Sequence, residues 1–482
     1  MKYLFTLCLI YGCLLQTCFA QDWKTFPYKP AESRVSFPVD EGRHTSEPVE
    51  WWYTSGQLTG KSSGKTYSFM LTYFYFPALT FDGFRILNIM DDATGKFYRD
   101  TKPLNYTELA TTYLDIKATL FSGEKESWSN IRDDAEKLIP YTYAIKAHSP
   151  VMGIDLKSTS LKRPLILDED GFLEQGLNNY TYYYSLTRNK VEGKLTLNGE
   201  EEEVSGISWI DRQYGNFNPH TGEKYEWFQV QLSNGMDMNF WNIFTFENKI
   251  SDSKKYRVLS VYVDDQTQYT TGDFSLERLE YQMMADKQMC YSSKWRLKSK
   301  VNNIDLIITA KDTNAEVVFP IRFYEGATEI TGTVNGSQVT GFGFAELLHT
   351  YESPKVVFTT PQETYYDPSL PISWTISNPD EGLPLKYDLA YSIDEKATWV
   401  NVIEGMKDTS FLWANLPLKG NENIWFKVTA SSADNKLMGF AISDQALKVK
   451  IPNAGSGKIN IYPNPVKDVL MIHSDFQMDD TR

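Results

Sequence analysis

The 482-residue sequence contains little cysteine and histidine and no long hydrophobic run after its first 20 residues, and each shortage excludes a class of protein. Three of the four cysteines lie in those first 20 residues, so Cys290 has no partner for an internal disulfide in the rest of the chain. The five histidines form neither a His-x-x-x-His pair nor a Cys/His cluster, so no metal site is predicted. No later stretch approaches the ~20 apolar residues of a membrane-spanning helix.

Positive charge is also scarce. The chain has 48 Lys and Arg against 62 Asp and Glu, a formal net charge of −14. A nucleic-acid partner is excluded because phosphate binding needs a basic surface. Gly64-Lys65-Thr66 imitates the end of a phosphate-binding loop but lacks its spacing and its following helix. We therefore predict no nucleic-acid partner and no nucleotide cofactor.

Residues 1–20 have the pattern of a cleaved secretory signal peptide. Lys2 supplies a positive start, Leu4–Leu15 is an apolar run, and Ala20 is a small residue at the cleavage point. A lipoprotein anchor on Cys18 is the alternative interpretation. Either way the pattern predicts a secreted or cell-surface protein, or a periplasmic one if no further export signal is read.

The rest of the chain is typical of β structure. Aromatic residues make up 14% of the sequence, and period-2 alternation recurs, as in Tyr225–Leu232 and Val258–Val263. Only Phe274–Gln288 is expected to form a short helix. Asn-Gly pairs at 198–199, 234–235 and 335–336 predict tight hairpins between such runs. About 330 residues of short strands exceed one small barrel, so two barrels or sandwiches in tandem are expected.

The C-terminal part divides again near Ser353-Pro354. Residues 354–452 resemble a fibronectin-III or immunoglobulin-like β sandwich, with short alternating strands spaced by turns. Its tryptophans are expected to pack in the core and at the edges of the sandwich. The functional alternative is that they form a sugar-binding face. These tryptophans are Trp374, Trp399, Trp413 and Trp425.

Residues 453–482 begin with the flexible linker Asn453–Gly457. Ile461–Val466 and Leu470–Ile472 then resemble the start of the C-terminal sorting domain read by the type IX secretion system. That resemblance implies an interaction with the secretion machinery.

The tetrapeptide Glu50-Trp51-Trp52-Tyr53 combines a carboxylate with three aromatic side chains. In a strand, Glu50 and Trp52 share one face while Trp51 and Tyr53 share the other. An acid beside an indole loses solvation, which raises its pKa toward the range that a proton donor needs.

A second segment repeats this combination. Alternation places Trp209 and Asp211 on one face, with Gln213 following, and turns Arg212 to the other face. Asp211 is therefore a second candidate for a proton donor.

The order of these segments resembles the AttH/carotenoid 1,2-hydratase (CrtC-like) family, also described as lipocalin-like secreted hydrolases. The resemblance spans roughly residues 35–352. It implies two tandem lipocalin-like (calycin) β-barrels, 21–217 and 218–353, in an all-β chain that ends in the sandwich. The matching motifs are Phe37-Pro38-x-Asp40-x-Gly42-x-His44, Glu50-Trp51-Trp52-Tyr53, Tyr183-Tyr184-Ser185-x-Thr187-Arg188, Gly206-x-x-Trp209-x-Asp211-Arg212, Glu325-Gly326 and Gly341-x-Gly343-x-x-Glu346-Leu347 with Tyr351.

The family includes enzymes that add water to isoprenoid double bonds, relatives that act on prenylated phenolics, and fungal relatives that guide cyclisations. The resemblance implies a cofactor-independent enzyme acting on a hydrophobic, isoprenoid-like small molecule. Two departures stand out. His349 replaces a small turn residue, and Leu87–Asp91 lacks a histidine that many members have.

Adding water to an alkene needs an acid, a stabilised cation and a positioned water; aromatic faces stabilise the cation. Asp211 is the expected acid, with Trp209, Trp52 and Tyr53 near the reacting carbon. Glu50 or His44 would position the water or take its proton. The expected catalytic residues are Asp211, Glu50, His44 and Tyr53. The expected substrate-binding residues are Trp51, Trp52, Trp209, Tyr214, Trp227 and Glu346.

Structural alternatives stay open for each of these residues. In these alternatives Asp211 and Arg212 form a structural ion pair that closes the first barrel onto the second, and Glu50 binds backbone amides at a strand end. Trp51 and Trp52 then fill the barrel bottom. A non-catalytic carrier of a hydrophobic molecule is the alternative function, and an adhesin built on the sandwich is a third. An acid that points into a cavity favours catalysis, whereas an arginine-paired acid outside it favours binding.

Overall fold

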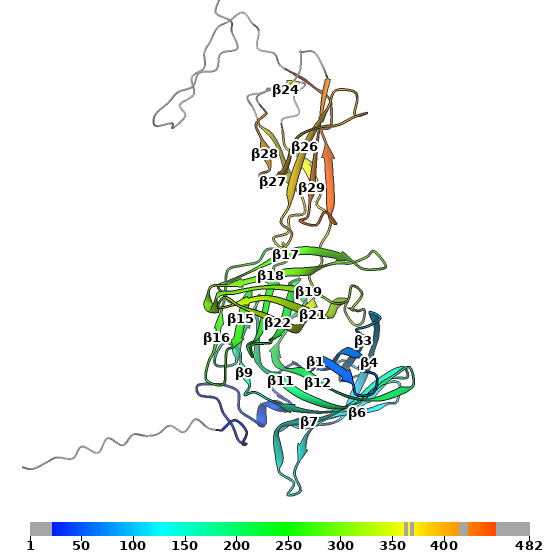
Figure 1. Cartoon of the computed structure of the whole chain (residues 1–482), viewed down its shortest axis with the longest axis vertical. Helices are drawn as coiled ribbons and strands as arrows, with labels where there is room; N and C mark the ends of the chain where they lie inside the picture. Colours follow the sequence, from blue (N-terminus) through cyan, green and yellow to red (C-terminus); the bar gives the residue numbers. More distant parts are fainter. Residues whose placement is uncertain (1–21, 361–364, 367–370, 414–422, 450–482) are drawn as a thin grey trace, which may run out of the picture.

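The computed structural model describes residues 22–360, 365–366, 371–413 and 423–449, and it is built almost entirely of β strands (Figure 1). The predicted signal peptide (1–20) and sorting tail (453–482) lie outside the described residues. The all-β fold class is confirmed. Three short 3-10 turns interrupt the described strands: η1 (Val39–Glu41), η2 (Pro219–Thr221) and η3 (Val301–Asn303).

The first sheet closes into a barrel. Strands β1 to β8 follow one another in space, β12 pairs with β1, and β11 pairs with both β12 and β8, which completes the ring. The short strands β9 and β10 add to β11. The strands are β1 (Val49–Gly60), β2 (Thr66–Tyr75), β3 (Gly83–Asp91), β4 (Lys96–Leu109), β5 (Asp115–Leu120), β6 (Lys125–Arg132), β7 (Leu138–His148), β8 (Met152–Ser160), β9 (Leu165–Ile166), β10 (Phe172–Gln175), β11 (Asn179–Leu197) and β12 (Glu200–Asn216).

The second sheet is a half-barrel that curls around its own core. Its order is β16-β15-β14-β13-β22-β21-β19-β18-β17, with β20 on β21, and within the described residues its two edge strands do not pair. The strands are β13 (Lys224–Leu232), β14 (Asp237–Phe244), β15 (Arg257–Tyr262), β16 (Gln268–Thr271), β17 (Phe274–Met283), β18 (Cys290–Ser299), β19 (Ile304–Ala310), β20 (Glu316–Val317), β21 (Phe323–Val334) and β22 (Ser337–Leu347).

The three predicted Asn-Gly turns are confirmed: they join β11 to β12, β13 to β14, and β21 to β22. Asn335 and Gly336 both have positive φ, as a two-residue hairpin of this type requires. The helix predicted for Phe274–Gln288 is wrong, because residues Phe274–Met283 form β17. Phe274, Leu276 and Arg278 are buried while Ser275 and Glu277 are exposed, which is a period of two.

Alternation along β1 and β12 divides their side chains between two cores. Trp52 and Ile210 belong to the core inside the barrel. Tyr53 faces the other way and belongs to an apolar layer between the barrel wall and the second sheet, together with Tyr183 and Trp227. We call this layer the intersheet layer. It lies where the two sheets stack in Figure 1.

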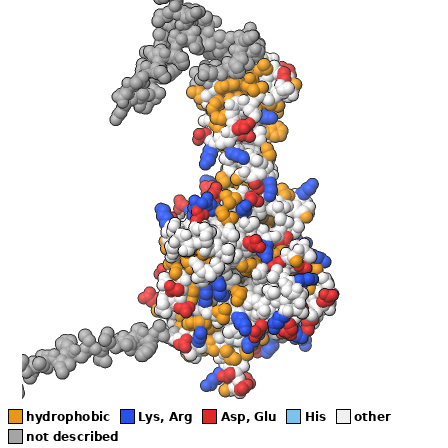
Figure 2. Space-filling view, in the orientation of Figure 1, with side chains coloured by type: hydrophobic (Ala, Val, Ile, Leu, Met, Phe, Trp, Pro, Cys, Tyr) orange, Lys and Arg blue, Asp and Glu red, His pale blue; other side chains and the backbone are white. Residues whose placement is uncertain are grey.

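The remaining described strands form a small module with its own core, which includes Trp374. It projects from the far side of the second sheet (Figure 1). Figure 2 shows charged side chains scattered over the two-sheet body and hydrophobic ones gathered on this module. The strands are β23 (Val356–Phe358), β24 (Tyr365–Tyr366), β25 (Ile372–Ile376), β26 (Lys386–Ser392), β27 (Val400–Met406), β28 (Ser410–Phe411), β29 (Asn423–Ser431), β30 (Met438–Ile442) and β31 (Leu447–Val449).

His349 attaches this module to the second sheet. Its side chain is fully buried, stacks on Phe244 with 3.6 Å between ring centres, and its Nε2 lies 2.8 Å from an Asp380 oxygen of the module. Tyr281 of β17 donates a hydrogen bond of 2.8 Å to the Gly382 carbonyl at the same junction. The histidine that departs from the family pattern therefore lies where the additional module docks.

Candidate active site

Two groups of buried acids lie on opposite faces of the β1–β12 pair. Inside the barrel, Glu50 is fully buried and forms ion pairs with Arg212 and Arg43. Burial alone would raise the pKa of Glu50, but the charge of Arg212, hydrogen bonds from His44 and Arg212, and the charge of Arg43 lower it to about 2. Glu50 is therefore a permanently charged partner of two arginines.

The other predicted residues inside the barrel hold this ion-pair group. The His44 ring lies 3.5 Å from the Tyr214 ring in a parallel stack, and its Nε2 is 2.8 Å from Asp40 Oδ1. Trp52 donates its indole N–H to a backbone carbonyl at 2.9 Å, and the Arg212 guanidinium lies 4.0 Å above the Trp52 ring. The expected alternative of an Asp211–Arg212 ion pair is wrong, because Arg212 points into the barrel and pairs with Glu50.

Asp211 faces the intersheet layer without a cation. It is 2% exposed and accepts three hydrogen bonds, from Tyr183 at 2.6 Å, Ser185 at 2.5 Å and the Trp209 indole at 2.6 Å. Burial raises the pKa of Asp211 to about 7, while those three donors oppose the rise and the charge of Glu346 adds to it.

Tyr183 is oriented from the second sheet. The Trp227 indole donates to its hydroxyl oxygen at 3.0 Å, and the Asn239 amide donates to the same oxygen at 2.8 Å. With two donors on its oxygen, the hydroxyl directs its own proton to Asp211. A chain of hydrogen bonds thus crosses from β13 and β14 to β12.

A second pair of acids faces this group from the half-barrel. Glu325 of β21 and Glu346 of β22 are directly opposite each other in the strand pair. Tyr53 donates to Glu325 Oε1 at 2.8 Å, and Tyr225 donates to Glu346. Within the described residues no Lys, Arg or His forms an ion pair with Asp211, Glu325 or Glu346.

The pKa values of both glutamates are raised. For Glu325 the causes are burial and then the adjacent Glu346, with a smaller contribution from the charge of Asp211. For Glu346 the cause is burial, opposed by its hydrogen-bond partners. Two carboxyl groups this close cannot both ionise, so the pair retains a proton near neutral pH.

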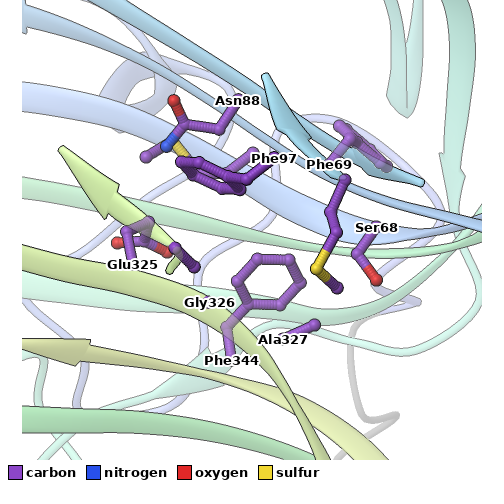
Figure 3. Close-up of a pocket in the computed structure, with 11 residues that line it drawn as sticks. Ser68, Phe69, Asn88, Phe97, Glu325, Gly326, Ala327 and Phe344 are labelled. Carbon is purple, nitrogen blue, oxygen red and sulfur yellow. The ribbon is translucent and has the colours of Figure 1, made fainter. Parts of the chain in front are cut away.

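A cavity lies beside Glu325 between the two sheets. Its volume is about 10 Å³, room for about one water molecule, and its wall is mainly Phe69, Met70, Met90, Phe97 and Phe344 (Figure 3). Glu325 lines this cavity, and its Oε2 atom receives no hydrogen bond from a hydroxyl, amide or cationic side chain. A carboxyl group with a raised pKa therefore faces an apolar cavity.

The structure separates the sequence-predicted residues into these two places. Tyr53, Trp209, Asp211, Trp227 and Glu346 lie in the intersheet layer, with Trp51 partly exposed at its edge. His44, Glu50, Trp52 and Tyr214 lie on the barrel side and do not join them.

Sequence reasoning missed five residues of the intersheet group. A usable signal existed for Glu325, because counting outward from the Asn335-Gly336 turn sets it opposite Glu346. Tyr183 and Ser185 stand in the family motif Tyr183-Tyr184-Ser185-x-Thr187-Arg188, whereas no signal marked Tyr225 and Asn239. The missed residues are Tyr183, Ser185, Tyr225, Asn239 and Glu325.

The described part of the chain contains neither a metal-binding cluster nor a membrane-spanning helix. No group of three or more His, Cys, Asp or Glu side chains there could hold a metal ion. No helix among those residues is long and apolar enough to cross a membrane.

Comparison with known proteins identifies relatives of the two-sheet body. A family model described as AttH-like matches residues 28–351. Kievitone hydratase of Fusarium solani subsp. phaseoli is 21% identical over 350 residues, which cover 68% of this chain and 92% of the hydratase.

Two crystal structures have a similar fold. Kievitone hydratase from Nectria haematococca has a TM-score of 0.54 and 18% identity, covering 67% of this chain and 98% of its own. A structure assigned to AttH from Nitrosomonas europaea has a TM-score of 0.53 and 22% identity, with the same coverage of 67% and 98%.

The raised pKa of Asp211 predicts how stability changes with pH. The folded state holds this proton up to a pKa of about 7, whereas the unfolded chain releases it near 3.8. The contribution is fully present below pH 3.8 and is lost as pH rises to about 7. We expect the free energy of unfolding of the native protein to fall between pH 5 and 8, and Asp211→Asn to reduce that fall, in urea titrations.

Glu50→Gln is the matched control for this experiment. The pKa of Glu50 is lowered to about 2, so the stability that its charge contributes is complete above its usual pKa of 4.5 and is lost only in more acidic solution. Between pH 5 and 8 this variant should differ from the native protein by a constant amount. Parallel curves for the native protein and Asp211→Asn would contradict the assignment.

Proposed function

The chain belongs to the AttH-like family, and on that premise we propose that it is a hydratase-like enzyme that adds water to a carbon–carbon double bond of a hydrophobic, isoprenoid-like molecule. The reaction needs no cofactor. One observation carries the proposal: Glu325, a buried carboxyl group with no cation paired to it, lies opposite Glu346 in the β21–β22 pair and lines an apolar cavity. The resemblance to kievitone hydratase, a hydratase by name, supports the same class of reaction.

Glu325 is the proposed proton donor. Its Oε1 accepts from Tyr53, and its Oε2 receives no hydrogen bond from a hydroxyl, amide or cationic side chain. A protonated Oε2 would transfer its proton to one alkene carbon, and a tertiary cation would form at the other. Efficient donors have a pKa near the working pH, and burial with a neighbouring acid supplies that shift here.

The cavity wall suits the cation that follows. The rings of Phe69, Phe97 and Phe344 offer negative faces to it, and the new Glu325 carboxylate supplies a counter-charge. Water then bonds to the cation through its oxygen and returns a proton to Glu325. The net change is alkene plus water to a tertiary alcohol, with the enzyme restored.

Asp211 has an electrostatic role in this proposal. Its charge raises the pKa of Glu325 and so helps to keep the donor protonated. All three of its hydrogen bonds are accepted ones, a pattern that suits an anion rather than a donor. The sequence-based choice of Asp211 as the acid remains the alternative, and Glu50 and His44 are proposed as a support for Arg212.

The export and architecture predicted from the sequence are also proposals. We propose that residues 1–20 direct secretion, that 453–482 form a partial type IX sorting tail, and that 354–452 are a fibronectin-III-like module. Sequence motifs alone support these assignments. Fractionation of the source cells, with and without residues 453–482, tests them: retention of the shortened chain inside the cell would support the tail, and unchanged export would contradict it.

Isotope incorporation tests the reaction. The full chain is incubated with kievitone and a panel of isoprenoid alkenes in oxygen-18 water, and products are analysed by mass spectrometry. The native protein should yield labelled alcohol. Glu325→Gln removes the proton and should lower the rate at least ~100-fold, as loss of a general acid does.

Glu41→Gln is the matched control, because Glu41 is also a buried carboxyl with a pKa raised to about 7 by burial but lies in the barrel core, bonded to Tyr143 and Asn130. It should keep the native rate. Full activity in Glu325→Gln with loss in Asp211→Asn would transfer the donor role to Asp211. A ligand that is retained unchanged would contradict the enzyme and support a carrier.

A further inference from the structure

Asn88 is an unusual residue in the wall of the intersheet cavity. It lies on β3 between Ile86 and Met90 of the same strand face, and it is only 2% exposed. Neither its amide nitrogen nor its amide oxygen has a hydrogen-bond partner. Figure 3 shows Asn88, from β3 of the barrel, and Glu325, from β21 of the second sheet, among the residues that line the cavity.

Such a side chain is costly without a ligand. Burying an amide with no hydrogen bond destabilises the folded protein, because the amide loses its bonds to water and gains none in return. The other polar group in the wall, Ser68, is satisfied, since its hydroxyl donates to Asp92 at 2.8 Å. The unpartnered polar atoms of this wall are therefore those of Asn88 and the Oε2 atom of Glu325.

These atoms define the chemistry of a complementary ligand group. An amide offers a donor and an acceptor, and a protonated carboxyl adds a donor. An anion would be repelled by the Glu325–Glu346 pair once it loses its proton, and an apolar group would leave the amide unsatisfied. A neutral hydroxyl, which both donates and accepts, satisfies the amide and the carboxyl together.

We propose that Asn88 and Glu325 form a hydroxyl-binding site in the cavity. The site rests on the proposed function only in treating this cavity as the place where the substrate binds. The hydroxyl has two possible sources, an alcohol group of the substrate or the water that adds to the double bond. In the first case the preferred substrate is an isoprenoid alcohol rather than a hydrocarbon.

Two small probes that differ by one hydroxyl test the first source. They are 3-methylbut-2-en-1-ol and 2-methylbut-2-ene, with binding to the full chain measured by ligand-observed NMR. A site built to bond a hydroxyl discriminates against the analogue that lacks it. We expect the alcohol to bind at least roughly tenfold more tightly, the worth of one well-made hydrogen bond.

Asn88→Leu has nearly the same size and should abolish this preference while retaining alkene binding. Asn88→Val serves if the leucine variant fails to fold. Ser68→Ala is the matched control, because it removes a hydroxyl from the same wall that is already bonded to Asp92. It should leave the preference unchanged.

A high-resolution crystal structure of the native chain tests the second source. An ordered water bonded to the Asn88 amide and Glu325, and absent from Asn88→Leu, would support the site with water as its occupant. No alcohol preference together with no such water would overturn the proposal. None of these readouts needs turnover, so failure of the oxygen-18 assay alone would contradict the proposed function and leave the hydroxyl site standing.

Discussion

Burial of three carboxyl groups between two β sheets, without a cation beside them, is the constraint on which the rest of the site depends. Asp211, Glu325 and Glu346 are each surrounded by hydroxyl, indole or apolar groups. A buried charge costs too much free energy to leave unpaired, so such groups either accept several hydrogen bonds or keep a proton. Asp211 accepts three hydrogen bonds and still has its pKa raised to about 7, and the Glu325–Glu346 pair keeps a proton.

On the other face of the same two strands, a buried acid is stabilised by ion pairing instead. Tyr53 pairs with Asp211 in the β1–β12 register, and the neighbouring Trp52 pairs with Arg212, which turns into the barrel toward Glu50. One strand pair therefore carries a charged, arginine-bound acid on its inner face and an uncharged environment on its outer face. A lipocalin-like barrel alone would not supply the second environment, because the second sheet is what excludes water from it.

Polar contacts fix the two sheets against each other around the cavity. Asp237 of the second sheet accepts from Thr187 at 2.8 Å and Arg188 at 2.7 Å, both of β11. At the other side, Lys311 pairs with Asp92 at 2.7 Å. Contacts that cross the interface in this way hold Asp211 of the barrel against the Glu325–Glu346 pair of the second sheet.

The sequence predicted the parts of this arrangement that follow from local period. Alternation assigned Trp209 and Asp211 to one face and Arg212 to the other, and the Asn-Gly turns located three hairpins. Counting back from the Asn198-Gly199 turn, however, sets Leu186 opposite Asp211. A bulge between Leu186 and Asn189 shifts the register by one residue and brings Ser185 there instead.

Contacts between the two sheets could not be predicted by counting residues from the turns. Nothing in the order of residues indicated that Asn88 and Glu325 would line one cavity, or that His349 would be buried against Asp380. Both depend on how complete sheets pack, and the local pattern of a strand carries no information about its partner across a layer.

Infrared spectroscopy tests the central claim most directly, because a protonated carboxyl group has a carbonyl stretching band that a carboxylate lacks. At pH 8 the acids with a pKa of about 7, Asp211 and Glu41, are mostly ionised. The account predicts that the native protein still shows this band at pH 8 and that the double variant Glu325→Gln, Glu346→Gln loses it. Absence of the band from the native protein, or its persistence in the double variant, would contradict a proton shared by Glu325 and Glu346.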